Sequence, residues 1–303
     1  MAPGNAPKIG TGEAVALALG AGGARGLAQI GVIEALQARG IKIVAVAGAS
    51  SGALVGGAFA AGKLDALRDW MLGTSRSGML RLLDPGFGRS ALFTGDRLVR
   101  RLREVVGEPL IEDLPIDFTA VAVDLARQRE VWLRRGDMWD AVRASFAIPG
   151  VFTPFELHGR ELVDGGLLAP LPIAATRLSD AHRLVAVDMH GWPSSPPAAL
   201  ASEDDADEAP KGRIARWLDE HFDDDDDEQR KPAERELGFA ELMSRSLDTM
   251  QAQISRVHIA LDPPEIVIHI PRDACDFYEF WRGRELIEIG RREADKVLDA
   301  AGY

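Results

Sequence analysis

Apolar positions along the chain alternate between short continuous runs and stretches with a helical period, a pattern typical of strands and helices in turn. Residues 15–19 and 41–47 are short apolar runs, and both predict buried strands. Between them, residues 24–38 carry apolar side chains at helical spacing, with Gly40 as a stop signal. Residues 51–61 are small and apolar almost all round, which predicts a helix packed closely on a sheet. This order predicts a right-handed parallel strand–helix–strand–helix unit.

The remainder of the chain continues this alternation. Strands are predicted at residues 117–123, 130–133, 184–189 and 265–270, and helices at residues 96–106, 137–145, 236–259 and 284–300. Together these elements predict one three-layer α/β/α domain over residues 1–303, built around a mainly parallel sheet. Residues 14–190 form its main part, residues 234–303 complete it, and residues 191–233 form an insertion.

The predicted insertion differs from the rest of the chain in its charge. The whole chain has a net charge of −12, and residues 203–228 alone account for −10 of it. With several prolines nearby, this composition predicts an exposed, mobile segment that is a lid, a binding loop or plain disorder. Its aspartate run, residues 223–227, is followed by Glu228 where a calcium loop requires glycine. The run therefore favours a solvated acidic tract over a calcium site.

Composition also limits the partners and the compartment. Apolar residues make up 46% of the chain and acidic residues outnumber basic ones, which argues against a sequence-independent nucleic-acid binder. The first ten residues lack the apolar core of a signal peptide, no stretch reads as a transmembrane helix, and the single cysteine, Cys275, forms no internal disulfide. We expect a cytoplasmic protein whose contact with membranes is peripheral and transient. An apolar stripe in the insertion favours docking on the protein itself over lipid, and it comprises Ile214, Trp217, Leu218 and Phe222.

A serine lies between the second predicted strand and the helix that follows it, in the sequence Gly48-Ala49-Ser50-Ser51-Gly52. A G-x-S-x-G pattern between a buried strand and a helix places the serine on a tight turn, where its hydroxyl is exposed to a substrate. The helix beyond the turn adds backbone donors and a partial positive charge near a developing oxyanion. The alternative is a small-residue turn that serves packing alone.

A glycine-rich loop, residues 20–26 (GAGGARG), follows the first predicted strand. A dinucleotide-binding fingerprint would need a glycine where Arg25 stands and an acidic residue after the second strand. A phosphate-binding loop would need a Gly-Lys-Ser or Gly-Lys-Thr ending, which the loop lacks. The remaining interpretation is a loop whose successive N–H groups converge on an oxyanion, and it accounts for the serine motif as well.

A third motif, Asp164-Gly165-Gly166, is by itself an ordinary turn. However, the three motifs occur in a fixed order, with residues 145–152 (SFAIPGVF) between the last two, and this set resembles the patatin-like phospholipase family. The resemblance covers residues 14–190 with motifs and the chain from residue 242 onward more loosely.

The resemblance implies a serine–aspartate dyad without a histidine, in which Ser50 is the nucleophile and Asp164 the general base. It implies that the glycine-rich loop forms the oxyanion hole, at Gly22, Gly23, Ala24, Arg25 and Gly26. The glycines that support the motifs are Gly48, Gly52, Gly165 and Gly166. Ala21 stands where many members have another glycine, and alanine keeps the N–H donor.

The same resemblance implies the reaction. We expect a lipid acyl hydrolase that cleaves carboxylic esters of phospholipids or lysophospholipids through an acyl-enzyme, with no cofactor and no metal ion. The sequence leaves open the head group, the acyl-chain length, the acceptor of the acyl group and the oligomeric state.

Two other functions remain as alternatives. A Ser-His-Asp esterase would use His190, which follows a predicted strand directly, although a hydrolase of that class has its histidine after the acid and more strands before the serine. A lipid-binding pseudoenzyme would keep the fold without the activity. Asp124 and Asp188 also lie near strand ends, and each is expected to be a turn former or a cap.

An aromatic cluster near the last helix has two interpretations, and it comprises Phe277, Tyr278, Phe280 and Trp281. Packing under the final helix is favoured over the lining of an acyl channel, because large aromatic side chains usually bury. Cys275, beside the cluster, is expected to be a packed thiol.

Overall fold

The computed structural model describes residue 9 and residues 13–86, 91–194 and 239–303. The acidic segment 203–228, its apolar stripe and its aspartate run therefore lie outside the described residues. None of the helices in the described ranges is long and apolar enough to cross a membrane.

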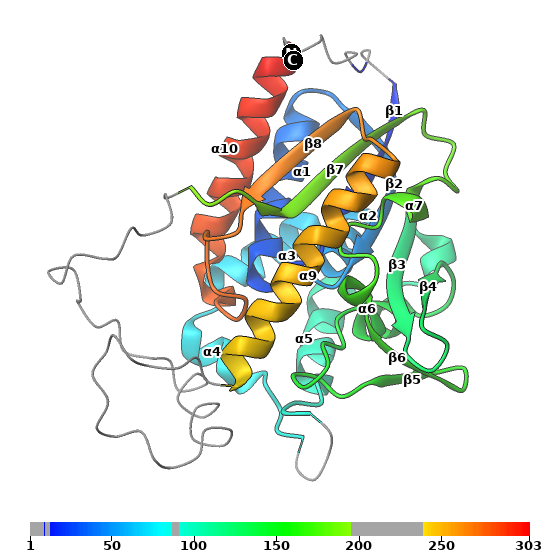
Figure 1. The fold of residues 1–303 in the computed structure, drawn as a ribbon, viewed down its shortest axis with the longest axis vertical. Helices are drawn as coiled ribbons and strands as arrows, with labels where there is room; N and C mark the ends of the chain where they lie inside the picture. Colours follow the sequence, from blue (N-terminus) through cyan, green and yellow to red (C-terminus); the bar gives the residue numbers. More distant parts are fainter. Residues whose placement is uncertain (1–8, 10–12, 87–90, 195–238) are drawn as a thin grey trace, which may run out of the picture.

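The described residues form one mixed sheet with helices on both of its faces (Figure 1). Its strands in chain order are β1 (Ala14–Leu19), β2 (Lys42–Ala49), β3 (Asp117–Asp124), β4 (Arg129–Leu133), β5 (Phe155–Leu157), β6 (Arg160–Asp164), β7 (Arg183–Gly191) and β8 (Ile266–Pro271). Along the path β5-β6-β3-β2-β1-β7-β8 each strand is hydrogen bonded to the next, and β4 pairs with β3 outside this path. The strands from β3 to β8 in this order run parallel, whereas β4, β5 and β6 pair antiparallel.

The α-helices are α1 (Ala28–Ala38), α2 (Ser51–Ala60), α3 (Leu64–Gly73), α4 (Arg76–Arg81), α5 (Asp96–Val106), α6 (Met138–Ser145), α7 (Ile173–Thr176), α9 (Phe239–Leu261) and α10 (Gly283–Ala301). Short 3-10 turns are η1 (Gly23–Leu27), η2 (Ile111–Asp113), η3 (Gly165–Leu167) and η5 (Phe280–Arg282). The predicted three-layer α/β/α architecture around a mainly parallel sheet is confirmed.

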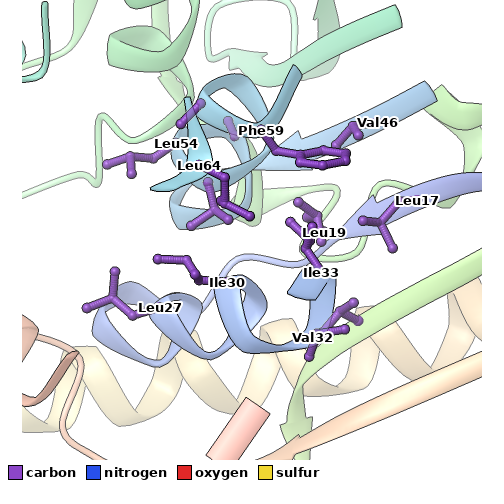
Figure 2. Close-up of a cluster of buried hydrophobic side chains, with 14 of the residues drawn as sticks. Leu17, Leu19, Leu27, Ile30, Val32, Ile33, Val46, Leu54, Phe59 and Leu64 are labelled. Atoms are coloured by element: carbon purple, nitrogen blue, oxygen red, sulfur yellow. The ribbon is translucent and has the colours of Figure 1, made fainter. Parts of the chain in front are cut away.

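Successive side chains of the central strands face opposite layers of helices, as the pleat of a strand requires. In β1, Leu17 and Leu19 face the larger core, where side chains of α1, α2 and α3 pack against β1 and β2 (Figure 2). Ala16 and Ala18 face the other side and join a smaller cluster beneath α7 and α9. The two clusters sandwich the sheet, so its central strands are buried on both faces.

Most of the predicted elements exist, and the differences are local. The helix predicted from residue 24 begins as the 3-10 turn η1 and becomes α-helical only at Ala28. The elements that the hydrophobic pattern missed are α3, α4, α7, β5 and β6. Four of them have only three to six residues, which give few turns or alternations from which a period can be read, whereas α3 has ten residues, as many as the predicted helix α2.

Helices α1 and α10 approach each other so closely that glycines occupy the contact. A Cβ on Gly290 of α10 would be 1.8 Å from the carbonyl oxygen of Ala28, and one on Gly31 of α1 would be 1.9 Å from that of Ile287. Each helix thus presents a glycine to the backbone of the other. This contact fixes α1, and with it the loop that precedes α1, against the carboxyl-terminal helix.

We expect Gly290→Ala to lower the free energy of unfolding by about 1–3 kcal/mol, because the two backbones must separate to admit the methyl group. Gly73→Ala is the matched control: Gly73 also lies in a helix, a Cβ there has no atom within 4 Å, and alanine favours the helix by up to about 1 kcal/mol. Urea denaturation monitored by circular dichroism measures both. Equal stability of Gly290→Ala and the wild type would contradict the close contact.

Candidate active site

Ser50 lies on a strained turn between β2 and α2. Its φ is +54° and its ψ is −122°, a conformation that costs a non-glycine residue about 1–3 kcal/mol. The turn is tight enough that a Cβ on Gly48 would be 2.3 Å from the carbonyl oxygen of Gly52. A Cβ on Gly52 would in turn be 2.1 Å from the carbonyl oxygen of Leu19. The two glycines of the motif are therefore required by close backbone contacts, and they hold the serine at the carboxyl end of β2.

Strand β3 brings Ser50 and Asp164 together although 114 residues separate them in the sequence. Ala49 of β2 pairs with Val121, and Asp164 of β6 pairs with Ala122, the next residue of β3. Because β4 pairs with residues 120–124 of β3, strands β2 and β6 follow one another along the opposite edge. The end of β2 and the end of β6 consequently meet at Val121 and Ala122.

The carbonyl group of Val121 organises this meeting point. It accepts a hydrogen bond of 2.6 Å from the hydroxyl of Ser145, which itself accepts one of 2.9 Å from the N–H of Ser50. A Cβ on Gly165 would be 2.0 Å from the same carbonyl oxygen, so the first glycine after Asp164 lies directly against β3. Ser145 is fully buried, and sequence reasoning assigned it no role, because one serine at a helix end carries no distinctive signal.

Asp164 is buried, with 3% of its surface exposed, and only one of its two carboxyl oxygens has a hydrogen-bond partner among the described residues. Its Oδ1 accepts a hydrogen bond of 2.6 Å from the N–H of Gly166, whereas no described residue forms a hydrogen bond of normal geometry with its Oδ2. Burial raises the pKa of Asp164 to about 7, even though the Ser50 hydroxyl and the Gly166 N–H beside it act in the opposite direction. The carboxyl group therefore changes its charge near neutral pH, next to the serine.

The glycine-rich loop runs from the end of β1 into η1, and part of its backbone is already hydrogen bonded. The N–H of Ala24 donates to the carbonyl of Phe277 over 2.8 Å, and that of Arg25 donates to Gly22 over 3.2 Å. Within the described ranges, the N–H groups of Gly22 and Gly23 have no protein acceptor. Gly26 lies against the start of α2, where a Cβ would be 2.2 Å from the Ser51 hydroxyl.

Close contacts also require glycine at the two positions of this loop whose N–H groups are free, Gly22 and Gly23. A Cβ on Gly22 would be 2.6 Å from the Cβ of Met189 in β7. Gly23 has a φ of +55°, and a Cβ there would be 2.5 Å from the carbonyl oxygen of Phe277. The loop is thus held between β7 and the segment before η5, which fixes the direction of its two free N–H groups.

The side chain of Arg25 anchors the loop to α9 and to the residue after β8, and its Nε also donates to the loop carbonyl of Gly22 over 3.5 Å. Its Nη1 donates to the carbonyl of Arg272 over 2.8 Å, and its Nη2 forms an ion pair with Asp248 of α9. The Arg25 side chain is 7% exposed and the Asp248 side chain 33%, so the pair is buried on the arginine side and open to solvent on the aspartate side. Asp248 was not predicted as a site residue, because a lone aspartate within a helical pattern gives no indication of what it faces.

His190 belongs to this anchor and lies on the far side of β1 from Ser50. Its Nδ1 is 3.4 Å from Asp188 and its Nε2 is 3.6 Å from Asp248. Burial by itself would raise the pKa of Asp188, but the imidazoles of His190 and His269 beside it hold that pKa well below its usual range. Since β7 and β2 flank β1 on opposite edges, about 10 Å separates their backbones.

The surroundings of Asp124 and Cys275, the remaining candidate residues, indicate structural roles. Asp124 closes the turn after β3, where its Oδ1 accepts the N–H of Arg127 over 2.9 Å and its Oδ2 accepts the guanidinium over 2.8 Å. Cys275 is buried, and burial raises the pKa of its thiol to about 12, as expected for a packed cysteine. In the described part of the chain, no cluster of three or more His, Cys, Asp and Glu side chains could hold a metal ion.

The aromatic cluster packs beside the glycine-rich loop and is half-buried throughout. The rings of Tyr278 and Trp281 have centroids 6.1 Å apart, and the guanidinium of Arg76 lies 4.8 Å from the Trp281 ring. Phe280 contacts the larger core. The cluster therefore supports η1 through the Phe277 carbonyl.

Comparison with known proteins places the chain in a family. The model of the family described as Patatin-like phospholipase matches residues 17–177. An "Uncharacterized NTE family protein" of Mycobacterium tuberculosis is 38% identical over 94% of this chain and 91% of its own length. "Lysophospholipase nte1" of Emericella nidulans is 34% identical over 59% of this chain and 12% of its own length.

The crystal structure of VipD from Legionella pneumophila aligns with 97% of this chain over 68% of its own chain. The sequence identity is 14% and the TM-score is 0.44. The family model and the full-length relative carry the assignment without it. The chain belongs to the patatin-like phospholipase family, whose activity is lipid hydrolysis.

Proposed function

We propose that the protein is a lipid acyl hydrolase that cleaves carboxylic esters of phospholipids or lysophospholipids with a Ser50–Asp164 dyad. One observation carries the proposal: β3 brings a strained serine and a buried carboxyl group with a pKa of about 7 to neighbouring positions on one strand edge. A general base is most effective when its pKa lies near the working pH. Asp164 has that property, and its Oδ2 is free of other partners.

Acylation follows from these positions. Asp164 accepts the proton of the Ser50 hydroxyl as its oxygen attacks the ester carbonyl carbon, and the carbonyl oxygen becomes an oxyanion. The N–H groups of Gly22 and Gly23 hold that oxyanion, whereas those of Ala24 and Arg25 are engaged within the protein. When the tetrahedral intermediate collapses, the alcohol leaves with the proton from Asp164 and the acyl group stays on Ser50.

Deacylation uses the same groups in the same roles, with water in place of the Ser50 hydroxyl as the nucleophile. Asp164 takes a proton from water as the water oxygen attacks the acyl-enzyme, and the oxyanion forms again beside Gly22 and Gly23. Collapse of this second intermediate releases the fatty acid, and Ser50 recovers its proton from Asp164. Every proton that Asp164 accepts is returned within the cycle, so the scheme needs no cofactor.

The position of His190 supports the dyad over a Ser-His-Asp triad. Its ring lies between the carboxylates of Asp188 and Asp248, and β1 stands between its strand and that of Ser50. The geometry at Ser50 also favours an enzyme over a lipid-binding pseudoenzyme, because a binding protein would have no reason to keep a strained serine beside an uncompensated carboxyl group. The name of the fungal relative, a lysophospholipase, supports a lipid ester as the substrate.

The dyad is tested by labelling with a fluorophosphonate. We expect the adduct on Ser50, and Asp164→Asn should slow labelling by about a hundredfold or more, because the serine loses its general base. His190→Gln should retain most of the rate. Intact-mass spectrometry with peptide mapping measures each variant. A rate that depends on His190 and not on Asp164 would establish a triad instead.

The pKa of Asp164 predicts the pH dependence. The base acts as a carboxylate, so kcat/KM on a soluble short-chain ester should rise as the pH increases through about 7 and level off above it. Initial rates between about pH 5 and about pH 9 give this profile. A kcat/KM that stays constant over this range, as for a base that titrates near pH 4 like an exposed aspartate, would show that Asp164 is not the group that limits the rate.

The anchor between Arg25 and Asp248 predicts an effect on turnover. Asp248→Asn removes the charge that holds Arg25, so the oxyanion donors should be less well positioned, and kcat should fall about tenfold with KM changed less than about twofold. Asp262→Asn is the matched control, since it breaks an exposed Arg177–Asp262 pair just beyond the end of α9. Steady-state kinetics on one ester compares the two. Equal activity of both variants would show that the Arg25–Asp248 pair does not position the oxyanion donors.

A further inference from the structure

Helix α9 contacts both parts of the proposed site. Its Asp248 pairs with Arg25 of the glycine-rich loop, and its Gln251, three residues further on, reaches the turn that follows Asp164. Side chains three residues apart are neighbours on one face of a helix. In Figure 1, α9 crosses β7 obliquely and continues past the carboxyl end of that strand. The helix therefore forms a wall of the site along the glycine-rich loop and the Asp164 turn.

The amide of Gln251 lies where these two segments meet. A Cβ on Gly166 would be 2.7 Å from the Nε2 of Gln251. The same Cβ would be 2.9 Å from the Cβ of Ala21 and 2.9 Å from the Oδ1 of Asp164. The amide, the glycine-rich loop and the carboxyl group of the proposed base thus surround one point.

The hydrogen-bonding groups of Gln251 are not used by the described part of the protein. Gln251 is half-buried, and no described residue forms a hydrogen bond with its amide. By contrast, Gln29, which also lies beside the glycine-rich loop, donates to the carbonyl of Gly20 over 2.7 Å. On the same flank of α9 as Gln251, the Nδ1 of His258 is 3.1 Å from the carbonyl oxygen of Leu171. The Gln251 amide is therefore available to a bound molecule.

The proposed reaction determines which part of a substrate meets this amide. The carbonyl oxygen of the ester faces the N–H groups of Gly22 and Gly23, whereas the alkoxy oxygen receives its proton from Asp164. The alcohol part of the ester must therefore lie on the side of Asp164. Gly166 and the amide of Gln251 stand on that side.

This side of the site also has room for the remainder of the alcohol. The connection after Gly166 leads to Leu168, which is 36% exposed and lines an open hollow of about 670 Å³. Trp132 and Arg129 of β4 line the same hollow. A head group can extend into this hollow while the atoms next to the ester stay beside Gln251.

The chemistry of an amide indicates what it binds there. An amide has both donors and an acceptor, so it can give a hydrogen bond to a hydroxyl group and receive one from it. A phosphate group only accepts, and proteins bind it most strongly through charged donors. The guanidinium on this wall of the site, that of Arg25, is already engaged by Asp248. An alkyl group would leave the amide without a partner.

We propose that Gln251 is a substrate-binding residue that hydrogen bonds to a hydroxyl group on the alcohol part of the ester, next to the scissile bond. The protein then prefers partial esters of a polyol such as glycerol over esters that lack a free hydroxyl at this place. The inference rests on the proposed function for the direction of the ester in the site, and its test separates the two.

The test compares two soluble esters with the same octanoyl chain and the same phosphocholine head group. One is a glycerol ester with a free hydroxyl on the carbon next to the ester, and the other is its propanediol counterpart without that hydroxyl. The ratio of their kcat/KM values is measured for the wild type, Gln251→Met and Gln253→Met. Methionine keeps the length of the side chain and removes the amide. Gln253 is the matched control, because it is exposed on the opposite side of α9.

We expect the wild type and Gln253→Met to prefer the hydroxyl ester by about tenfold, and Gln251→Met by less than about twofold, because it lacks the hydrogen bond. A general loss of activity cancels in the ratio, so a folding defect does not imitate this result. Equal rates of the wild type on the two esters, or an undiminished preference in Gln251→Met, would overturn the proposal. An undiminished preference with a shifted pH profile would instead make Gln251 a positioning residue of Asp164.

Binding separates this inference from the proposed reaction. Ether analogues of the two lipids are not hydrolysed, and calorimetry measures their Kd on Ser50→Ala and on Ser50→Ala/Gln251→Met. A preference for the hydroxyl ether that is lost with Gln251→Met would support the Gln251 contact, and absence of hydrolysis by the wild type would then remove only the dyad. Hydrolysis that depends on Ser50, without a hydroxyl preference in rate or in Kd, would keep the dyad and remove the role of Gln251.

Discussion

The site depends on one edge of β3, because two strands of opposite direction share it. Val121 pairs with the end of β2 and Ala122 pairs with the end of β6. Because β2 runs parallel to β3 and β6 runs antiparallel to it, Ser50 and Asp164 lie at adjacent positions although their strands run in opposite directions. The hydroxyl of Ser145 and the backbone of Gly165 both lie against the Val121 carbonyl, which holds the Ser50 turn and the Asp164 turn next to each other. The strain at Ser50 persists because this surrounding structure determines the position of the turn.

The raised pKa of Asp164 follows from the hydrogen-bond donors and cations that are missing around its carboxyl group at this edge of β3. The meeting of β2, β3 and β6 buries the carboxyl group, yet it supplies one backbone donor and no cation. Asp188, at a similar depth in β7, lies between two histidines and keeps a low pKa. Two buried aspartates at strand ends of one sheet thus differ in charge near neutral pH, and the difference comes from their neighbours.

The sequence predicted the long elements and the tight turn at Ser50, since a buried strand, two glycines and a small-residue helix define that turn locally. It also predicted β3 and β7, whose apolar runs are long enough to read. The pairing of β6 with β3 was out of reach, because β6 has five residues and its register is set by contacts far away in the sequence. The roles of Ser145 and Asp248 depend on partners 24 and 223 residues away, so only the folded chain shows them.

The central claim is that Ser50 attacks the ester with Asp164 as its base and with Gly22 and Gly23 as donors to the oxyanion. A crystal structure of the covalent organophosphonate adduct tests this most directly, since the phosphonyl oxygen occupies the place of the oxyanion. The account predicts phosphorus on the Ser50 Oγ, the phosphonyl oxygen within hydrogen-bond distance of both glycine N–H groups, and Asp164 beside the serine oxygen. An adduct whose serine oxygen contacts His190, or whose phosphonyl oxygen points away from Gly22 and Gly23, would contradict it.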